Sequence, residues 1–245
     1  MTINLKEDER IDDLMRNGFK LIQNTGIFCF GMDAVLLCAF SHINEKDRVL
    51  DMCTGNGIIP ILLRARYGYG DYTGIEIQDI NVDMAKRSVL LNDIEDCVKI
   101  IRGDVKEAGT LFGGTCFDVV TVNPPYMKEN HKLKSPNDCK AIARHEIMCT
   151  LEDVVSQASK VLKHNGRLYM VHRPARLVEI FESMRRNHIE PKRMKMVHPH
   201  ADSEANMVLI EGVKGGKAML KTEAPIVVYD KNGGYTEELL KLYNK

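Results

Sequence analysis

The sequence predicts an α/β fold, in which an open, seven-stranded, mostly parallel sheet has one antiparallel strand and follows a short N-terminal strand pair. Three observations predict it. Short apolar runs rich in β-branched residues alternate with segments of helical period between residues 46 and 213. A glycine-rich turn joins the first of these runs to the helix after it. Acidic or amide side chains stand where successive runs end, which indicates a site at the carboxyl edge of a parallel sheet.

Length and composition favour a single domain. A chain of 245 residues that is 44% hydrophobic can bury one good-sized core. We expect one domain over residues 1–245, made of an N-terminal strand pair and helix (1–45), a cofactor-binding core (46–213) and a C-terminal extension (214–245). Lysine plus arginine and aspartate plus glutamate balance at 34 each, so any surface that binds nucleic acid must be local.

Nothing in the sequence indicates an exported protein, a membrane protein or a metal protein. Residues 4–16 are polar without a secretion signal, and no apolar run approaches the ~20 residues of a membrane span. The seven cysteines never form a C-x-x-C pair, which indicates reduced thiols and a cytoplasmic protein. His198 and His200 flank Pro199, but no third ligand lies nearby, so we expect no metal.

Strands and one helix are expected before the glycine-rich turn. Residues 1–17 are polar and are expected to be only partly ordered. Residues 18–31 look like two short strands around an Asn-Thr-Gly turn. An apolar helix follows over 32–40, with Asp33 near its N-terminus, where a carboxylate is favoured by capping and by the helix dipole.

The glycine-rich turn is the first indication of a cofactor. A strand over 48–53 leads into the loop 54–57, and a helix follows over 58–67. Glycines let the backbone approach a ligand and aim amide donors at it. The spacing is G-x-G-x-x-P, with Pro60 where a dinucleotide fingerprint has a third glycine, so the turn alone is weak evidence.

Three carboxylates strengthen the prediction of an adenosine-containing cofactor. Glu76 ends the next strand, 21 residues after Gly55, which is the offset at which a carboxylate meets both hydroxyls of a ribose. Asp104 ends a third strand and suits a hydrogen bond to an adenine amino group. Asp51, before the turn, either orients the loop or reaches the far end of the cofactor. Each alone could be a loop or capping carboxylate, but their order at successive strand ends indicates a cofactor.

The tetrapeptide Asn123-Pro124-Pro125-Tyr126 is where we expect the chemistry. It ends a buried apolar strand, and its prolines stiffen the chain at the cofactor crevice. The Asn123 side-chain oxygen and the Pro124 carbonyl are acceptors, and an exocyclic NH2 group offers two donors. Tyr126 offers a face on which a base can stack, worth ~1–3 kcal/mol per base. The alternative is a proline-rich turn without a role.

The remaining elements continue the alternation. Helices are expected over 79–92, weakly over 105–112, and over 151–162, 174–187 and 236–243, with strands over 167–172, 192–198 and 205–213. Asn165 and Gly166 are predicted to close the helix before them as a left-handed cap. The last two strands of the sheet bring in its antiparallel member, and residues 226–229 form an extended piece.

Two basic clusters are candidates for contact with phosphate. The first lies in the long segment 127–149 and includes Lys128, Arg144 and His145. The second spans residues 185–200. The alternative for both is a solvated charged face. The first cluster directly follows the predicted base-binding motif, which favours contact with a nucleic acid.

The Asn-Pro-Pro-Tyr tetrapeptide resembles the motif of S-adenosylmethionine-dependent methyltransferases that act on amino or amide nitrogen. The Ala-Arg-His-Glu stretch at 143–146 resembles one bacterial subgroup. The order of motifs over residues 18–243 resembles the bacterial valine-tRNA adenine-N6 methyltransferases, which modify the adenine next to the anticodon. One departure is that Cys53 and Thr54 stand where many such enzymes carry glycine and another small residue.

The resemblance implies a Rossmann-like class I methyltransferase fold, S-adenosyl-L-methionine as cofactor and direct in-line transfer to the adenine amino group. It implies tRNA as partner, no membrane, no metal, and a monomer or weak dimer. The implied cofactor-binding residues are Asp33, Asp51, Cys53, Thr54, Gly55, Asn56, Gly57, Glu76, Ile77, Asp104, Val105 and Asn123. The implied catalytic residues are Asn123, Pro124, Pro125 and Tyr126, and the implied substrate-binding residues are Tyr126, Lys128, Arg144 and His145.

Other functions stay open at this point. Glutamine N5-methyltransferases of release factors share the tetrapeptide, but they usually carry a separate helical domain before the glycine turn, where this chain has strands. An rRNA or DNA adenine-N6 methyltransferase would use the same chemistry. A nicotinamide oxidoreductase is disfavoured by Pro60 and by the tetrapeptide. A catalytically silent RNA-binding module is disfavoured by the intact set of Asp51, Glu76, Asp104 and Asn123.

Overall fold

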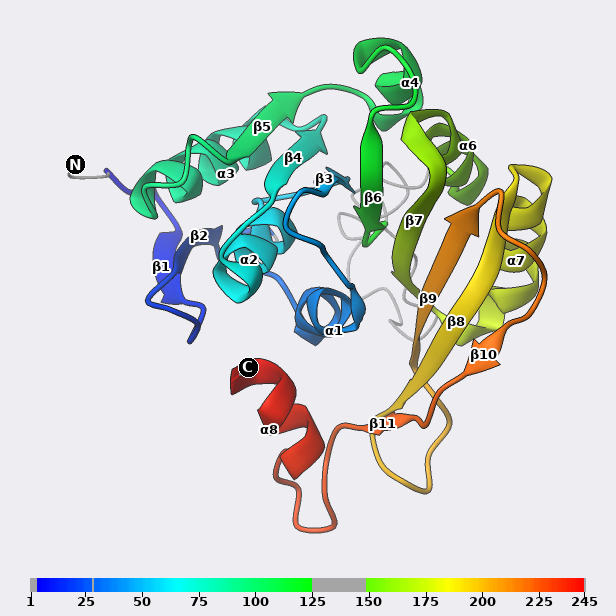
Figure 1. Ribbon diagram of the computed structural model, residues 1–245. Helices are drawn as coiled ribbons and strands as arrows, with labels where there is room; N and C mark the ends of the chain where they lie inside the picture. The colour runs from blue at the N-terminus through cyan, green and yellow to red at the C-terminus, as the bar shows by residue number, and fades with distance from the viewer. Residues whose placement is uncertain (1–3, 28, 125–148, 245) are drawn as a thin grey trace, which may run out of the picture.

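The protein is built on one large twisted sheet, as Figure 1 shows for the computed structural model, which describes residues 4–27, 29–124 and 149–244. Its strands lie in the order β10 (Lys221–Thr222), β8 (Ile189–His198), β9 (Met207–Lys214), β7 (Leu162–His172), β6 (Phe117–Val122), β3 (Arg48–Met52), β4 (Asp71–Glu76) and β5 (Val98–Arg102), and β11 (Ile226–Val227) also pairs with β8. Neighbours from β7 to β5 are parallel, and β9 is antiparallel to both β7 and β8. The predicted seven strands with one antiparallel member are confirmed, and the two-residue strands β10 and β11 add to them.

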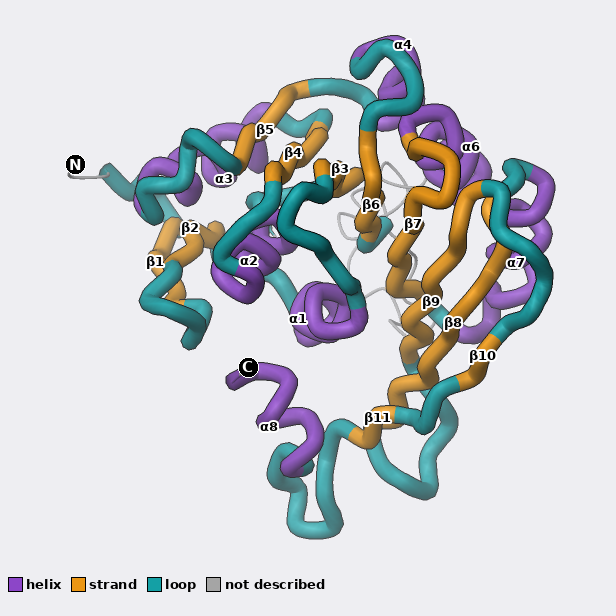
Figure 2. The backbone as a smooth tube through the Cα atoms, in the orientation of Figure 1, coloured by secondary structure: helices purple, strands orange, loops and turns teal. Residues whose placement is uncertain are grey.

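Helices cover both faces of the sheet because successive strand residues point to opposite sides (Figures 1 and 2). One face carries α1 (Met32–Phe40), α2 (Ile58–Tyr67) and α3 (Asp79–Leu91), and the other carries α4 (Ala108–Leu111), α6 (Leu151–Val161) and α7 (Leu177–Arg186). Val49 and Val119 lie in the first core, whereas their neighbours Leu50 and Val120 lie in the second. One hydrophobic core therefore lies on each face of the sheet.

The N-terminal strand pair exists, but the prediction of both strands within residues 18–31 is wrong. β1 (Glu9–Asp13) pairs antiparallel with β2 (Lys20–Asn24), apart from the large sheet. The Asn24 side chain accepts a hydrogen bond from the backbone N–H of Gly26 (2.9 Å), so the Asn-Thr-Gly stretch ends a strand without turning it into a hairpin. β1 is the charged sequence ERIDD, which local propensity does not mark as a strand.

The strand pair docks on α3 through specific polar contacts. The Arg87 guanidinium pairs with Glu9 (2.6 Å) and with Asp83 (2.7 Å). The backbone N–H of Ile22 donates to the Ser88 hydroxyl at 2.9 Å. These contacts hold β1 in place, although this charged strand has little hydrophobic pattern of its own.

Asn165 takes the left-handed conformation that the sequence predicts, with φ of 63°, but it does not cap a helix. α6 ends at Val161 and β7 begins at the next residue, so helix and strand follow directly. The register between β6 and β7 shifts just before Val119, which pairs with Arg167, while Phe117 pairs with Leu162. Asn165 therefore belongs to an irregularity of a long strand.

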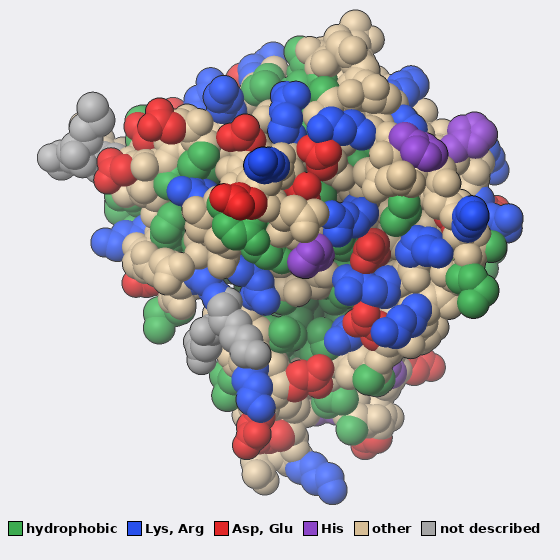
Figure 3. Space-filling model, in the orientation of Figure 1, with side chains coloured by type: hydrophobic (Ala, Val, Ile, Leu, Met, Phe, Trp, Pro, Cys, Tyr) green, Lys and Arg blue, Asp and Glu red, His purple; other side chains and the backbone are tan. Residues whose placement is uncertain are grey.

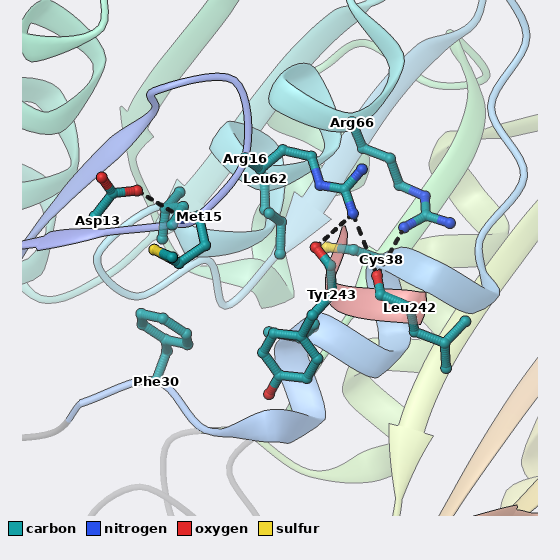
Figure 4. Close-up of a pocket in the computed structure, with 11 residues that line it drawn as sticks. Asp13, Met15, Arg16, Phe30, Cys38, Leu62, Arg66, Leu242 and Tyr243 are labelled. Carbon is teal, nitrogen blue, oxygen red and sulfur yellow. Dashed lines mark hydrogen bonds between the residues drawn. The ribbon is translucent and has the colours of Figure 1, made fainter. Parts of the chain in front are cut away.

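The C-terminal extension returns to the first face of the sheet and ends in α8 (Glu237–Asn244), whose Leu239 is buried in the core there (Figure 1). Arg16 Nη2 donates to the Tyr243 carbonyl (2.7 Å), and Arg66 Nη1 donates to the Leu242 carbonyl (3.3 Å), across a small cavity (Figure 4). Cations near the last carbonyls of a helix are favoured by its dipole. These contacts join the two ends of the described chain.

Three short elements complete the described chain: η1 (Val105–Glu107), η2 (Pro174–Arg176) and the helical turn α4. The predicted weak helix over 105–112 is thus a 3-10 turn followed by one α-helical turn. Pro174 opens η2 at its first position, as its sequence context predicts. Among the described residues, no helix is both long and apolar enough to cross a membrane.

Candidate cofactor and acceptor site

The side chains predicted to bind the cofactor gather at one edge of the sheet. Asp51 lies near the end of β3, Glu76 ends β4, Asp104 follows β5 and Asn123 follows β6. These strands are parallel neighbours, so their carboxyl ends meet at the same edge. The structure therefore brings together the set that the sequence places only at successive strand ends.

The loop after β3 has the backbone conformation that its glycines predict. Cys53, Gly55 and Gly57 all take positive φ values, of 57°, 56° and 84°. A Cβ at Gly57 would lie 3.1 Å from the Ala85 Cβ, so both the backbone angle and the space favour glycine there. Gly57 precedes α2 and provides no side-chain cap, which leaves backbone N–H groups at the start of that helix for other partners.

Glu76 holds the glycine loop against β4. Its Oε2 accepts from the backbone N–H of Gly55 and its Oε1 from that of Gln78, both at 2.9 Å. The side chain is buried at 6% exposure. Each carboxylate oxygen keeps a second acceptor position, since one hydrogen bond uses only one of its lone pairs. Contact of Glu76 with a ribose stays a prediction.

Asp51 is the most deeply buried of these carboxylates, at 1% exposure. Its Oδ1 accepts from the Thr121 hydroxyl at 2.7 Å. Its Oδ2 and the buried Thr54 hydroxyl have no hydrogen-bond partner within the part of the chain that the structure describes. Burial raises the pKa of Asp51 to about 7, the nearby Thr54 and Thr121 hydroxyls oppose the rise, and the Glu76 charge adds to it.

An unpartnered buried acceptor is costly unless something outside the chain satisfies it. The Asp51 Oδ2 atom suits an ammonium donor, such as the amino-acid end of S-adenosylmethionine, and the backbone N–H groups at the start of α2 suit a carboxylate. The donor set at this edge therefore fits the cofactor that the sequence implies.

The other predicted cofactor residues have contacts within the protein. Asn56 Nδ2 donates to the Ile22 carbonyl at 3.3 Å, which ties the glycine loop to the strand pair. Asp104 caps η1, because its Oδ1 accepts from the Lys106 backbone N–H at 2.9 Å. Val105 is buried in the second core, whereas Ile77 is half-buried after β4. Their roles toward a cofactor stay predictions.

Asn123 is bonded to a residue 90 positions earlier in the chain. Its Nδ2 donates to Asp33 Oδ2 at 2.9 Å, and Asp33 Oδ1 accepts from the Ala34 backbone N–H at 3.0 Å. Asn123 is half-buried, and the Pro124 after it is buried. Asp33, which the sequence suggests as a helix cap or a cofactor contact, thus lies at the predicted acceptor motif. Side-chain contacts between distant segments leave no local signal in a sequence.

Two polar residues at this edge have roles that sequence reasoning missed. Thr121 lies inside an apolar run, yet its hydroxyl holds Asp51. His172 ends β7 at 1% exposure, and its Nδ1 accepts from the Arg173 backbone N–H at 2.8 Å. Burial lowers the pKa of His172 to about 4, so the ring is neutral at pH 7. A polar residue inside a buried strand run was the available signal for both.

Several predicted site residues lie outside the described residues. They are the second half of the tetrapeptide and the cations of the first basic cluster: Pro125, Tyr126, Lys128, Arg144 and His145. Within the described chain, no group of three or more His, Cys, Asp or Glu side chains is arranged to hold a metal ion.

The second basic cluster, 185–200, is largely neutralised by neighbouring groups. Arg185 pairs with Glu190 (3.4 Å) and Arg186 with Glu152 (3.4 Å). Arg193 and Lys195 also pair with carboxylates, at 2.8 Å from Glu211 and 3.5 Å from Glu223. Lys192 donates to the Lys217 backbone carbonyl at 3.0 Å, which satisfies a donor but does not neutralise the charge. Cations and carboxylates also intermingle on the molecular face in Figure 3. This region therefore offers less free positive charge than its sequence indicates.

Comparison with protein families and curated proteins gives consistent results. The family model described as "Methyltransferase small domain" matches residues 18–188. The tRNA1(Val) (adenine(37)-N6)-methyltransferase of Porphyromonas gingivalis is 26% identical over 220 residues, covering 86% of each chain. The protein of the same name from Aeromonas salmonicida is 26% identical over 217 residues, covering 86% of this chain and 87% of that one.

Solved structures share the fold. An Agrobacterium tumefaciens protein described as a "predicted O-methyltransferase" has a TM-score of 0.71 at 23% identity, covering 87% of this chain and 96% of that one. TYW2 of P. horikoshii in complex with MeSAdo has a TM-score of 0.60 at 16% identity, covering 86% and 73%. At these identities the likeness shows the fold alone, and that fold is the methyltransferase one predicted from the sequence.

Proposed function

The chain belongs to the methyltransferase small domain family, and from that premise we propose that it methylates the exocyclic amino group of an adenine in tRNA, next to the anticodon. The curated relatives with this named activity align over most of both chains, which supports the choice of tRNA. The observation that carries the proposal is the place of Asn123: it follows β6 at the carboxyl edge, beside the strand that ends in the glycine loop.

The residues proposed to hold S-adenosylmethionine are those at the ends of β3, β4 and β5. Asp51 and Thr54 would receive its amino-acid end, Glu76 its ribose and Asp104 with Ile77 its adenine. The unpartnered Asp51 oxygen and Thr54 hydroxyl support the first of these assignments. When bound, S-adenosylmethionine supplies an electrophilic methyl group on a sulfonium centre.

The acceptor side is proposed to work by placing a nitrogen in line with that methyl group. Asn123 Oδ1 and the Pro124 carbonyl accept the two N–H groups of the amine. These hydrogen bonds strengthen as positive charge develops on the nitrogen, so they favour the transition state over the bound substrate. No general base is needed in the slow step. Tyr126 is proposed to stack on the adenine, which must leave its own stack first.

The test is transfer of labelled methyl from S-adenosylmethionine to total tRNA from a strain that lacks this protein, followed by nucleoside mass spectrometry. We expect labelled N6-methyladenosine in tRNA with the wild-type protein. Label on a release-factor glutamine, with none in RNA, would contradict the proposal and favour the glutamine N5 activity. Label in rRNA or DNA alone would keep the reaction and refute the substrate.

A further inference from the structure

The amide of Asn123 has two ends of nearly the same shape and opposite character. Its oxygen accepts hydrogen bonds, whereas its NH2 group donates them, and the neighbours decide which end points where. Asp33 is the neighbour that decides here. A carboxylate is an acceptor only, so the 2.9 Å contact between Asp33 Oδ2 and the Asn123 amide fixes the NH2 end toward α1. The oxygen end is thereby turned to the other side.

Asp33 is itself held so that it cannot easily give up this role. Its second oxygen accepts from the Ala34 backbone N–H at 3.0 Å, in the first turn of α1, where the helix dipole favours a negative charge. The segment before α1 is anchored as well, because the Phe30 backbone N–H donates to Gln23 Oε1 at 2.9 Å. Gln23 is buried at 2% exposure and bonds in turn to Asp12 of β1. The strand pair therefore supports the placement of α1, and α1 supports Asn123.

We propose that Asp33 is a positioning residue for methyl transfer: it holds the Asn123 amide so that its oxygen, and not its NH2 group, meets the amino group of the substrate. This inference rests on the proposed function. A flipped amide would place donors against donors at the reacting nitrogen. The Asp33 charge also polarises the amide through the hydrogen bond, which makes the oxygen a better acceptor for the charge that develops on nitrogen.

Replacement of Asp33 by asparagine distinguishes this role from others. Both carboxylate oxygens now receive a hydrogen bond, but a new asparagine side chain has only one oxygen. If that oxygen keeps the Ala34 N–H, the new NH2 group faces Asn123 and favours the flipped amide. Asp33→Ala imposes no orientation. Both variants lose a charged hydrogen bond to Asn123, and we expect kcat to fall about tenfold in Asp33→Ala for that reason. In Asp33→Asn the Asn123 amide is also inverted, so we expect kcat to fall about a hundredfold.

The readouts are kcat and KM for tRNA, and the Kd of S-adenosylmethionine by calorimetry, for both variants. The expected result is an unchanged cofactor Kd with Asp33→Asn slower than Asp33→Ala. A loss of cofactor affinity that matches the loss of turnover would overturn the proposal and make Asp33 a cofactor contact. Equal losses of kcat in the two variants, or a larger loss in Asp33→Ala, would also overturn the proposal, because Asp33 would then act only as a charge at the start of α1. Glu179→Gln is the matched control, because it removes an exposed acidic residue from the first turn of α7.

A spectroscopic measurement on the wild-type protein needs no tRNA and no stable Asp33 variant. The side-chain NH2 signal of Asn123 is assigned by its absence in Asn123→Ala. We expect one of its protons to resonate downfield and to exchange slowly with water, because it is bound to a carboxylate. A freely rotating, fast-exchanging NH2 group would refute the proposal. Failure of wild-type protein to label tRNA, with this signal present, would refute only the proposed substrate.

Discussion

The two halves of the proposed site are held by different kinds of contact. The cofactor half, made of Asp51, the loop 54–57 and Glu76, lies within one strand–loop–helix–strand unit, and Glu76 bonds directly to the loop. The acceptor half, made of Asn123 and Pro124, depends on α1, which lies 90 residues away in the chain. The first half is fixed mainly by local chain geometry, with long-range support from Thr121 and Ile22. The second is fixed by tertiary packing, so the two can be perturbed separately.

Asp51→Asn should give the largest effect on the cofactor half. The variant keeps an oxygen for the Thr121 hydroxyl but loses the charge that the cofactor ammonium is proposed to meet. We expect the Kd of S-adenosylmethionine to rise about a hundredfold at pH 8, which is within the range for loss of a buried charged partner. Calorimetry measures it. An unchanged Kd would remove Asp51 from the cofactor half.

The same variant should stabilise the protein without cofactor. The pKa of Asp51 is raised to about 7 in the folded state. Between about pH 4 and pH 7, the native protein therefore keeps a proton on this carboxyl group, whereas the unfolded chain has already lost it. Wild-type stability from this group therefore falls as the pH rises through that window. We expect Asp51→Asn to gain on the order of 4 kcal/mol at pH 8 and little at pH 4. Thermal unfolding at both pH values is the check, and a gain that does not depend on pH would contradict it.

Gly57→Ala should damage the glycine loop by strain. The residue has φ of 84°, and the added Cβ would lie 3.1 Å from Ala85. We expect a loss of about 2 kcal/mol in the free energy of unfolding, together with weaker cofactor binding, because an L-residue is disfavoured at this angle. Gly113→Ala is a useful control, since Gly113 also has positive φ but has open space around its Cβ position. Equal losses in the two variants would show that backbone angle alone matters.

Thr121→Val should have a smaller effect of the same kind. It keeps the shape of the side chain and removes the 2.7 Å hydrogen bond to Asp51. We expect a loss of about 1–2 kcal/mol at pH 8, because a buried carboxylate loses its hydrogen bond to the Thr121 hydroxyl. At pH 4, where Asp51 is protonated, the loss should be smaller. Urea unfolding at both pH values measures the difference, and equal losses would mean that the hydroxyl does not act through the charge.

Substitutions in the two basic clusters should have the smallest effects, and their effects on tRNA binding should differ between the clusters. Arg185 and Arg186 already pair with Glu190 and Glu152, so their joint replacement by alanine should weaken tRNA binding less than about threefold. Joint replacement of Lys128 and Arg144 should weaken it about tenfold, if they meet phosphates as predicted. Filter binding at two salt concentrations measures the tRNA affinity of both double variants. A larger loss of affinity in the Arg185 and Arg186 variant would indicate that RNA binds at residues 185–200 instead.

Sequence reasoning succeeded where local pattern determines structure. The bounds of α1 and α2, and a mostly parallel sheet with one antiparallel strand, follow from periodicity, from the glycine turn and from alternation of strands with helices. It failed for β1, whose charged residues form a strand only because β2 and α3 hold them. It also assigned Asn165 to a helix cap, because a left-handed residue after a helix usually ends it.

The candidate site could be predicted from the sequence to about the same extent as the fold. Single carboxylates at strand ends carry a local signal, and the structure places the predicted ones at one edge of the sheet, while their contact with a cofactor stays a prediction. The bond from Asp33 to Asn123, the support of Asp51 by Thr121 and the pairing of the cations in 185–200 depend on which segments lie side by side. No spacing within one segment encodes such pairs. The tertiary structure was needed to find them.

The most direct test of separate cofactor and acceptor halves is Asn123→Ala, examined by calorimetry with S-adenosylmethionine and by methyl transfer to tRNA on the same preparation. We predict a cofactor Kd within about twofold of wild type and a loss of methyl transfer of at least about a hundredfold, the size typical for removal of one transition-state hydrogen bond. Parallel loss of both would contradict the account, because Asn123 would then support the cofactor half as well.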